Sequence, residues 1–263
     1  MEQLTNTILA NFNLFILILI RVTGIFVAAP VFARNNFPML LKVGLSATIS
    51  FILLPTLGEG YMLEINGFLQ LGYYSMMEFL IGLLIGFISF TYFTVIYVAG
   101  TIIDVQMGFS MVNVFDPQTN TQVPIMGNFY NNIISLLFIV MNGHHLLIRA
   151  LVGSYRLLPV GFTFTIGDNV VVQMTMIFSE IFILAVKFSA PVLITVILVD
   201  ILLGVLARTM PQMNVFVVGM PLKIVVGMVM ILITLPFVIP FSEILFNRMF
   251  ESVFDILKIL SKG

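Results

Sequence analysis

The chain has 263 residues, of which 60% are hydrophobic and 9% are charged, and its mean hydropathy is +1.15. Soluble domains carry about 25% charged residues, so this composition excludes a soluble globular protein and indicates an integral membrane protein. The net charge of −1 provides no basic surface for nucleic acid, and the absence of cysteine excludes disulfides and thiolate metal sites.

Six long apolar segments follow one another along the chain. They cover approximately residues 12–33, 40–57, 68–98, 129–148, 170–206 and 213–246. A helix that crosses a bilayer needs about 20 residues, so the third and fifth segments are too long for one straight crossing. The sequence therefore predicts an all-α polytopic protein in which each of these two segments tilts steeply, bends, folds into a hairpin or projects out of the bilayer.

The charges between the segments contradict a simple six-span topology. The first connection is basic and the second acidic, as expected for the inside and the outside of a membrane. The third connection should lie inside, yet it contains Asp104 and Asp116 and no lysine or arginine. The fourth should lie outside, yet it contains Arg149 and Arg156. We therefore predict that the fold is not a standard six-span bundle.

Several prolines interrupt the apolar segments, and a proline inside a membrane helix leaves a carbonyl group without its usual partner. The positions are Pro30, Pro191, Pro221, Pro236 and Pro240. These residues predict bent helices that pack against protein. Gly82 and Gly86 are spaced as small residues are where two membrane helices approach closely.

Charged residues within apolar segments are costly in hydrocarbon and need partners. The candidates for this role are Arg21, Glu78, Glu180, Lys187 and Asp200 within the segments, and Arg208 just after the fifth segment. One interpretation is a proton or ion relay, as in a secondary transporter; the other is a set of structural pairs at helix or subunit interfaces. Their mixed signs and scattered positions favour structural charges, and Asp200 and Arg208 are the pair that we expect to interact.

A polar, proline-containing insert lies at about residues 104–127 between two apolar segments. From Asp104 to Met111, small or polar residues alternate with large apolar ones, which is typical of an extended segment. Asp116 and Pro117 then favour a turn. Extended backbone with this much apolar surface must be buried in protein or line a cavity. We therefore predict that the insert is an element of a pore.

No motif for an enzyme is present. The chain has neither the HExxH motif of metalloproteases nor the GxSxG motif of serine hydrolases, and His144 and His145 have no acidic partner at metal-ligand spacing. We predict a protein without catalytic residues, metal or cofactor.

Three motifs identify a family. "GFSMVNVFDPQTNTQVPIMGNFYN", "MNGHHLLI" and "DILLGVLARTMPQMNVFVVGMPLKI" closely resemble the FliR family of flagellar type III export proteins, and "RVTGIFVAAPVF" fits the same family. The resemblance covers about residues 12–246. A related family in virulence injectisomes has the same fold, although "FDPQTN" and "PQMNVFVVG" favour the flagellar one.

The absence of a linker predicts one integral membrane domain over residues 1–263. The resemblance implies that it is built from bent helical hairpins and lies in the bacterial cytoplasmic (inner) membrane at the flagellar basal body. It implies a hetero-oligomeric ring with FliP and FliQ, FlhB nearby, and unfolded flagellar export substrates. It also implies a plug in the closed channel. The plug residues would be Gly108, Phe109, Ser110, Met111, Val112, Asn113, Val114, Phe115, Asp116 and Pro117.

Two alternatives to a plugged export gate stay open from the sequence: a secondary transporter with an intramembrane charge relay, and a purely structural scaffold for the gate. Within the plug interpretation, Met107 and Met111 are candidates for a compliant seal. On an extended segment they would face the same side as Val105 and Phe109, and methionine is flexible enough to fill irregular gaps.

Overall fold

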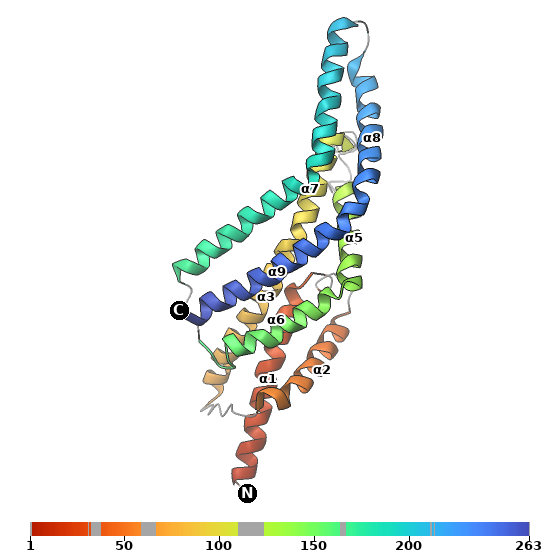
Figure 1. Ribbon diagram of the computed structural model, residues 1–263. Coiled ribbons are helices and arrows are strands. Elements are labelled where there is room, and N and C mark those ends of the chain that lie inside the picture. Colours follow the sequence, from red (N-terminus) through yellow and green to blue (C-terminus); the bar gives the residue numbers. More distant parts are fainter. Residues whose placement is uncertain are drawn as a thin grey trace. The chain divides into compact units, whose positions relative to one another are not determined.

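The computed structural model describes residues 2–30, 32, 38–58, 67–109, 124–163, 167–210, 212 and 214–262, with the backbone alone for 2–11 (Figure 1). Within these ranges the regular structure is helical and contains no strand, which confirms the all-α prediction. The helices are α1 (Glu2–Ala28), α2 (Met39–Gly58), α3 (Phe68–Met107), α5 (Ile125–Val140), α6 (Gly143–Leu157), α7 (Asp168–Thr209), α8 (Val215–Thr234), η3 (Leu235–Phe237) and α9 (Val238–Lys262).

The chain forms two compact units. The first comprises residues 1–91, 142–177 and 247–263, and the second comprises residues 92–141 and 178–246. The long helices α3, α7 and α9 contribute residues to both units, so neither unit is a continuous stretch of sequence. Each unit has its own core and is described by itself below.

In the first unit, α1 lies beside α2 and crosses α3 at very short range. Glycines at the crossing make this approach possible. A Cβ atom on Gly82 would overlap the backbone carbonyl of Arg21, and one on Gly86 would lie 2.8 Å from the Ile25 carbonyl oxygen. On the opposite helix, a Cβ on Gly24 would lie 2.7 Å from the Phe79 carbonyl oxygen. The close helix approach predicted from the spacing of Gly82 and Gly86 is therefore confirmed.

The first unit also contains amphipathic helices. In the part of α9 after residue 246, one face is buried and the opposite face is charged. The buried residues are Met249, Val253, Ile256, Leu257 and Leu260. Two exposed ion pairs, Arg248–Glu251 and Asp255–Lys258, occupy the other face. A helix with such a face contacts water or polar protein rather than lipid tails.

In the second unit, three aromatic rings from different helices form the centre of the core. Phe93 of α3, Phe138 of α5 and Phe246 of α9 have ring centroids 5.2–5.8 Å apart. The helices α7 and α8 run side by side in opposite directions, as Figure 1 shows, with Leu203 packed against Gly219. Most large side chains on this hairpin are exposed and apolar.

The predicted segments correspond to helices, but several of their boundaries differ. The fourth segment, 129–148, is broken into α5 and α6 at Met141 and Asn142, where Asn142 adopts a left-handed conformation with φ 58°. The sixth is broken at η3, which contains Pro236. By length and composition, four described helices are long and apolar enough to cross a membrane, or five if α5 and α6 form one broken span. The described helices therefore do not form a standard six-span bundle.

Candidate functional site

The described part of the polar insert begins as helix and not as an extended segment. Helix α3 continues to Met107, and Gly108 follows with φ 88°, a left-handed conformation that ends many helices at glycine. The prediction of extended backbone is therefore wrong for residues 104–107, and α5 begins at Ile125, so both boundaries of the insert move inward. Among the residues predicted to form the plug, Gly108 and Phe109 are described, and residues 110–117 lie outside the described ranges.

The helical conformation also changes the environment predicted for the methionines. Met107 is completely buried and packs against Gly227 of α8, where a Cβ atom would lie 2.7 Å from its methyl carbon. Val105, which should have shared its face, is 60% exposed, because residues two apart on a helix point in different directions. The prediction that Met107 and Val105 face the same side is therefore wrong. Met111 lies outside the described residues, and the seal stays a prediction.

A cavity of about 610 Å³ lies in the second unit, where the end of α3 meets α7 and α8. Its walls are mainly apolar, and its polar groups come from one residue on each helix: Gln106, Asp200 and Lys223. Gly108 also lines it, so the cavity adjoins the first residue of the insert. Gly108 is the part of the insert that the structure places at this cavity, and the pore role of the rest stays a prediction.

The acidic residue in this cavity has a different partner from the one expected. Asp200 forms an ion pair with Lys223 of α8, and Arg208 is exposed. The two side chains of the pair are 39% and 26% exposed, respectively. The predicted Asp200–Arg208 pair is wrong, because residues eight apart on one helix lie more than two turns from each other. The ion pair instead joins α7 to α8.

Because this ion pair is partly exposed, we expect Asp200→Ala and Asp200→Asn each to lower the unfolding free energy by less than about 1 kcal/mol. The yield of assembled complex should fall only slightly. Chemical unfolding of the purified protein would measure the change in free energy. The reversed pair, Asp200→Lys with Lys223→Asp, is the control, and it should unfold like the unmodified protein. A loss of several kcal/mol in Asp200→Asn would show that the carboxylate has a role beyond this ion pair.

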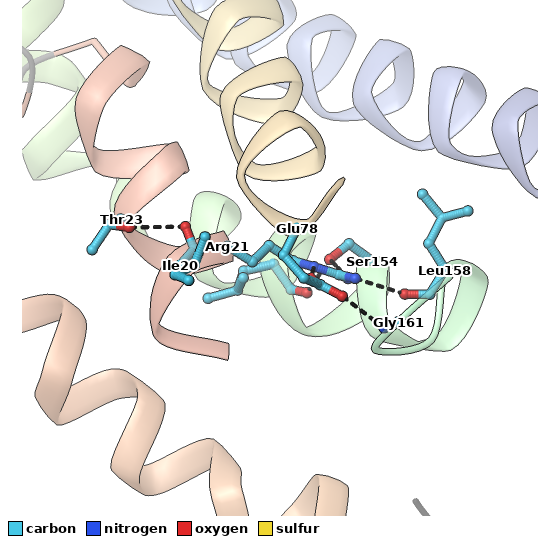
Figure 2. Close-up of polar contacts among 8 residues, drawn as sticks. Ile20, Arg21, Thr23, Glu78, Ser154, Leu158 and Gly161 are labelled. Carbon is cyan, nitrogen blue, oxygen red and sulfur yellow. Dashed lines mark hydrogen bonds and ion pairs between the residues drawn. The ribbon is translucent and has the colours of Figure 1, made fainter. Parts of the chain in front are cut away.

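The charges that are most deeply buried lie in the first unit (Figure 2). Arg21 of α1 and Glu78 of α3 are both completely buried, and the Arg21 Nε atom donates a hydrogen bond to Glu78. Arg21 also donates to the Ser154 hydroxyl and to the Leu158 carbonyl oxygen, each at 3.0 Å. The second Glu78 oxygen accepts from the Gly161 N–H at 2.9 Å.

The buried pair therefore ties three segments together: α1, α3 and the end of α6 with the turn that follows it. The guanidinium group also lies over the ring of Tyr155, 4.0 Å from its centroid, which is a favourable cation–π position. Each charged group has several hydrogen-bond partners within the unit, as a buried ion pair needs. This arrangement favours the structural interpretation of Arg21 and Glu78 over a charge relay.

The remaining sequence-predicted charges, Glu180, Lys187 and Arg208, all lie on α7. Glu180 accepts a hydrogen bond of 2.9 Å from the Tyr92 hydroxyl, and Lys187, two turns further along α7, is exposed. The rings of His144 and His145 lie 4.3 Å apart at the start of α6. Across the described ranges, no group of three or more acidic or histidine residues has the arrangement of a metal site.

One buried acidic residue was not recognised from the sequence as a candidate site. Asp104 is 2% exposed and accepts hydrogen bonds from the backbone N–H groups of Met126 and Gly127. The sequence assigned it to the extended insert, where a carboxylate needs no buried partner. The available signal was its lone position between apolar residues, four residues before Gly108, where a helix can end.

Comparison with known proteins agrees with the resemblance found in the motifs. The chain matches the bacterial export proteins, family 1, over residues 12–249. It is 35% identical to the flagellar biosynthetic protein FliR of Bacillus subtilis over 97% of this chain and 98% of that protein. The corresponding protein of Escherichia coli is 31% identical, with 93% of both chains covered. The secretion system apparatus protein SsaT of Salmonella typhimurium is 27% identical, over 75% of this chain and 77% of that protein. The chain therefore belongs to family 1 of the bacterial export proteins, together with the flagellar biosynthetic proteins FliR.

Proposed function

We propose that this protein is a non-enzymatic subunit of the flagellar type III export gate in the bacterial cytoplasmic membrane. Family membership carries the proposal, since relatives that match nearly their whole length bear the name flagellar biosynthetic protein. In this role the chain forms a ring with FliP and FliQ, lies near FlhB, and encloses a channel for unfolded flagellar proteins.

The exposed surface of α7 supports a place in an assembly. Helix α7 has 42 residues, about 63 Å of helical path at 1.5 Å per residue, whereas the hydrocarbon core of a bilayer is about 30 Å thick. Large apolar side chains are exposed along its whole length, from Val171 to Leu206. Because a continuous helix crosses the bilayer once, lipid covers only about half of this surface. Neighbouring protein subunits cover the rest.

Purification through an affinity tag on this chain tests the proposed assembly. We expect FliP and FliQ to copurify in constant ratio through size-exclusion chromatography in mild detergent. If the protein is instead a secondary transporter with a charge relay, the chain would purify as a monomer or a small homo-oligomer. Recovery of the chain alone from cells that express all three proteins would contradict the export-gate proposal.

The plug is the second part of the proposal, and it rests on the resemblance of residues 108–117 to the plug of the family and on Gly108, which lines the cavity. In cells that carry the assembled complex, replacing residues 109–120 by a glycine–serine linker of equal length should increase passive leakage of small solutes through the membrane. The linker keeps the connection between α3 and α5 and removes only the side chains. Solute uptake into membrane vesicles would measure the leak. Unchanged uptake with normal assembly would favour the structural scaffold without a plug.

A further inference from the structure

Asp104 connects two helices that are separated in sequence by the insert. It lies on α3, one turn before the helix ends, and its side chain is buried. Both carboxylate oxygens lie 3.0 Å from the backbone nitrogen of Met126, and one lies 3.4 Å from that of Gly127. Met126 and Gly127 belong to the first turn of α5. The carboxylate therefore joins the residues immediately before the insert to those immediately after it.

Helix α5 needs such a partner, because its own N-cap residue provides none. The first N–H groups of any helix have no acceptor within the helix, and a side chain of serine, threonine, aspartate or asparagine at the N-cap usually supplies one. The N-cap of α5 is Pro124, which makes no side-chain hydrogen bond, and the first backbone bond within the helix runs from Asn128 to the Pro124 carbonyl. Asp104 supplies the acceptor from another helix.

The same contact compensates the charge of Asp104. A buried carboxylate is costly unless it is paired or fully hydrogen-bonded. No cationic side chain among the described residues pairs with Asp104, so its partners are the N–H groups at the positive end of the α5 dipole. Each side therefore requires the other: without Asp104 the N–H groups of α5 lose their acceptor, and without α5 the carboxylate is buried alone.

The backbones of the two helices touch one turn away from this contact. A Cβ atom on Gly100 of α3 would overlap Gly127 of α5, and one on Gly127 would lie 3.2 Å from the Tyr97 carbonyl oxygen. Position 100 therefore requires glycine for the helices to approach so closely, and position 127 has little room for a larger residue. The glycine contact and the carboxylate contact act together, since the short distance between the backbones brings the α5 N–H groups within reach of Asp104.

From this geometry we propose that Asp104 is a positioning residue that caps α5 from α3 and so fixes the two points from which residues 108–124 depart and return. Its importance for export rests on the proposed export-gate function, but the capping contact itself does not. The proposal assigns Asp104 neither ion binding nor proton transfer. What matters is an acceptor oxygen at this place, with a side chain of this length.

Thiol labelling of the full chain in bacterial membranes tests the proposal, because the chain has no cysteine and an engineered one is the only reporter on it. Met126→Cys places the thiol at the capped turn, where the native side chain is 7% exposed, and leaves the backbone N–H in place. Ile134→Cys, two turns further along α5 at a completely buried position, is the control for general unfolding. The measurement is the labelling rate with a membrane-permeant maleimide.

We expect Asp104→Ala to increase labelling at position 126 by about tenfold, as expected for local opening after loss of a hydrogen bond to a charged group. Labelling at position 134 should not change. Asp104→Asn keeps an acceptor and should label nearly like the parent, whereas Asp104→Glu should label fast, because the longer side chain does not fit between the touching backbones. Thr101→Ala is the matched control on α3, since Thr101 donates only to its own helix at Tyr97.

Gly100→Ala provides a second test that leaves the carboxylate in place and remains informative if Asp104→Ala does not assemble. The added methyl group pushes the backbones apart, so labelling at position 126 should rise as in Asp104→Ala. Gly72→Ala on the same helix, where nothing lies within 4 Å of the added carbon, should have no effect.

Parent-like labelling in Gly100→Ala would overturn the proposal. So would fast labelling in Asp104→Asn together with slow labelling in Asp104→Glu, because that pattern identifies charge as the requirement. These rates do not depend on export, so failure of the export-gate function would leave them unchanged.

Discussion

Replacing Glu78 by alanine should destabilise the protein by about 3–5 kcal/mol, because it leaves the Arg21 guanidinium buried without its counter-charge. Both side chains are completely buried, so water does not reach the orphaned charge. The Gly161 N–H loses its acceptor in the same variant. Thermal unfolding in detergent, followed by circular dichroism, would measure the loss, and a low yield of assembled complex should accompany it.

A double variant separates the charge from the packing at this position. In Arg21→Met with Glu78→Leu, no buried charge is left, and replacement of a buried pair by apolar side chains is often close to neutral. The Ser154 hydroxyl and the Leu158 carbonyl still lose a hydrogen-bond donor. The unfolding temperature of the double variant should therefore be lower than that of the unmodified protein and much higher than that of Glu78→Ala. Glu251→Ala, which breaks an ion pair whose side chains are 57% and 62% exposed, is the matched control and should have little effect. Equal unfolding temperatures for Glu78→Ala and Glu251→Ala would contradict a structural role of the buried pair.

Two glycine-to-alanine substitutions in α3 should change stability in opposite directions. The methyl group of Gly82→Ala would overlap the Arg21 backbone carbonyl, and such overpacking costs about 1–3 kcal/mol. Gly72→Ala adds a methyl group in open space and should stabilise the helix by about 0.5–1 kcal/mol, because alanine loses less backbone entropy than glycine. Unfolding in detergent under identical conditions would compare the two.

The consequences of Gly82→Ala should extend to the buried ion pair. Gly82 lies one helical turn after Glu78, so the close approach that it allows brings the α1 backbone to the level at which Arg21 reaches Glu78. Gly86→Ala, one turn further, should be destabilised as well, since its added carbon would lie 2.8 Å from the Ile25 carbonyl oxygen. A stabilising effect of both Gly82→Ala and Gly72→Ala would show that α1 and α3 are not in contact in the native assembly.

The sequence alone was sufficient for the membrane class, the helical composition, the close approach at Gly82 and Gly86, and the family. These features depend on composition and on spacing along one helix, which are properties of local sequence. The same holds for the conclusion that six simple spans do not fit, since the lengths and charges of the segments contradict them directly.

Secondary structure predicted from the local sequence pattern was wrong where a tertiary contact determined the backbone conformation. Alternation over residues 104–111 predicted an extended segment, but residues 104–107 are helical, because Asp104 and Met107 are buried against α5 and α8 in that conformation. A short alternating pattern carries too little information to outweigh such contacts. The break at Asn142 was missed although Gly143 follows it and an Asn–Gly pair commonly marks a turn, because the pair lies inside a long apolar segment.

The partners of the charges were determined only by the tertiary structure. The sequence placed Arg21, Glu78 and Asp200 among the structural charges, but it paired Asp200 with Arg208 on the same helix, whereas the partner is Lys223 on the next. Arg21 and Glu78 lie 57 residues apart, and Asp104 lies 22 residues before the N–H group that it accepts. A sequence shows which buried groups need a partner, because the cost of burial is a property of the residue. The partner itself depends on which helices touch, and in this chain that is decided by glycines that let their backbones meet.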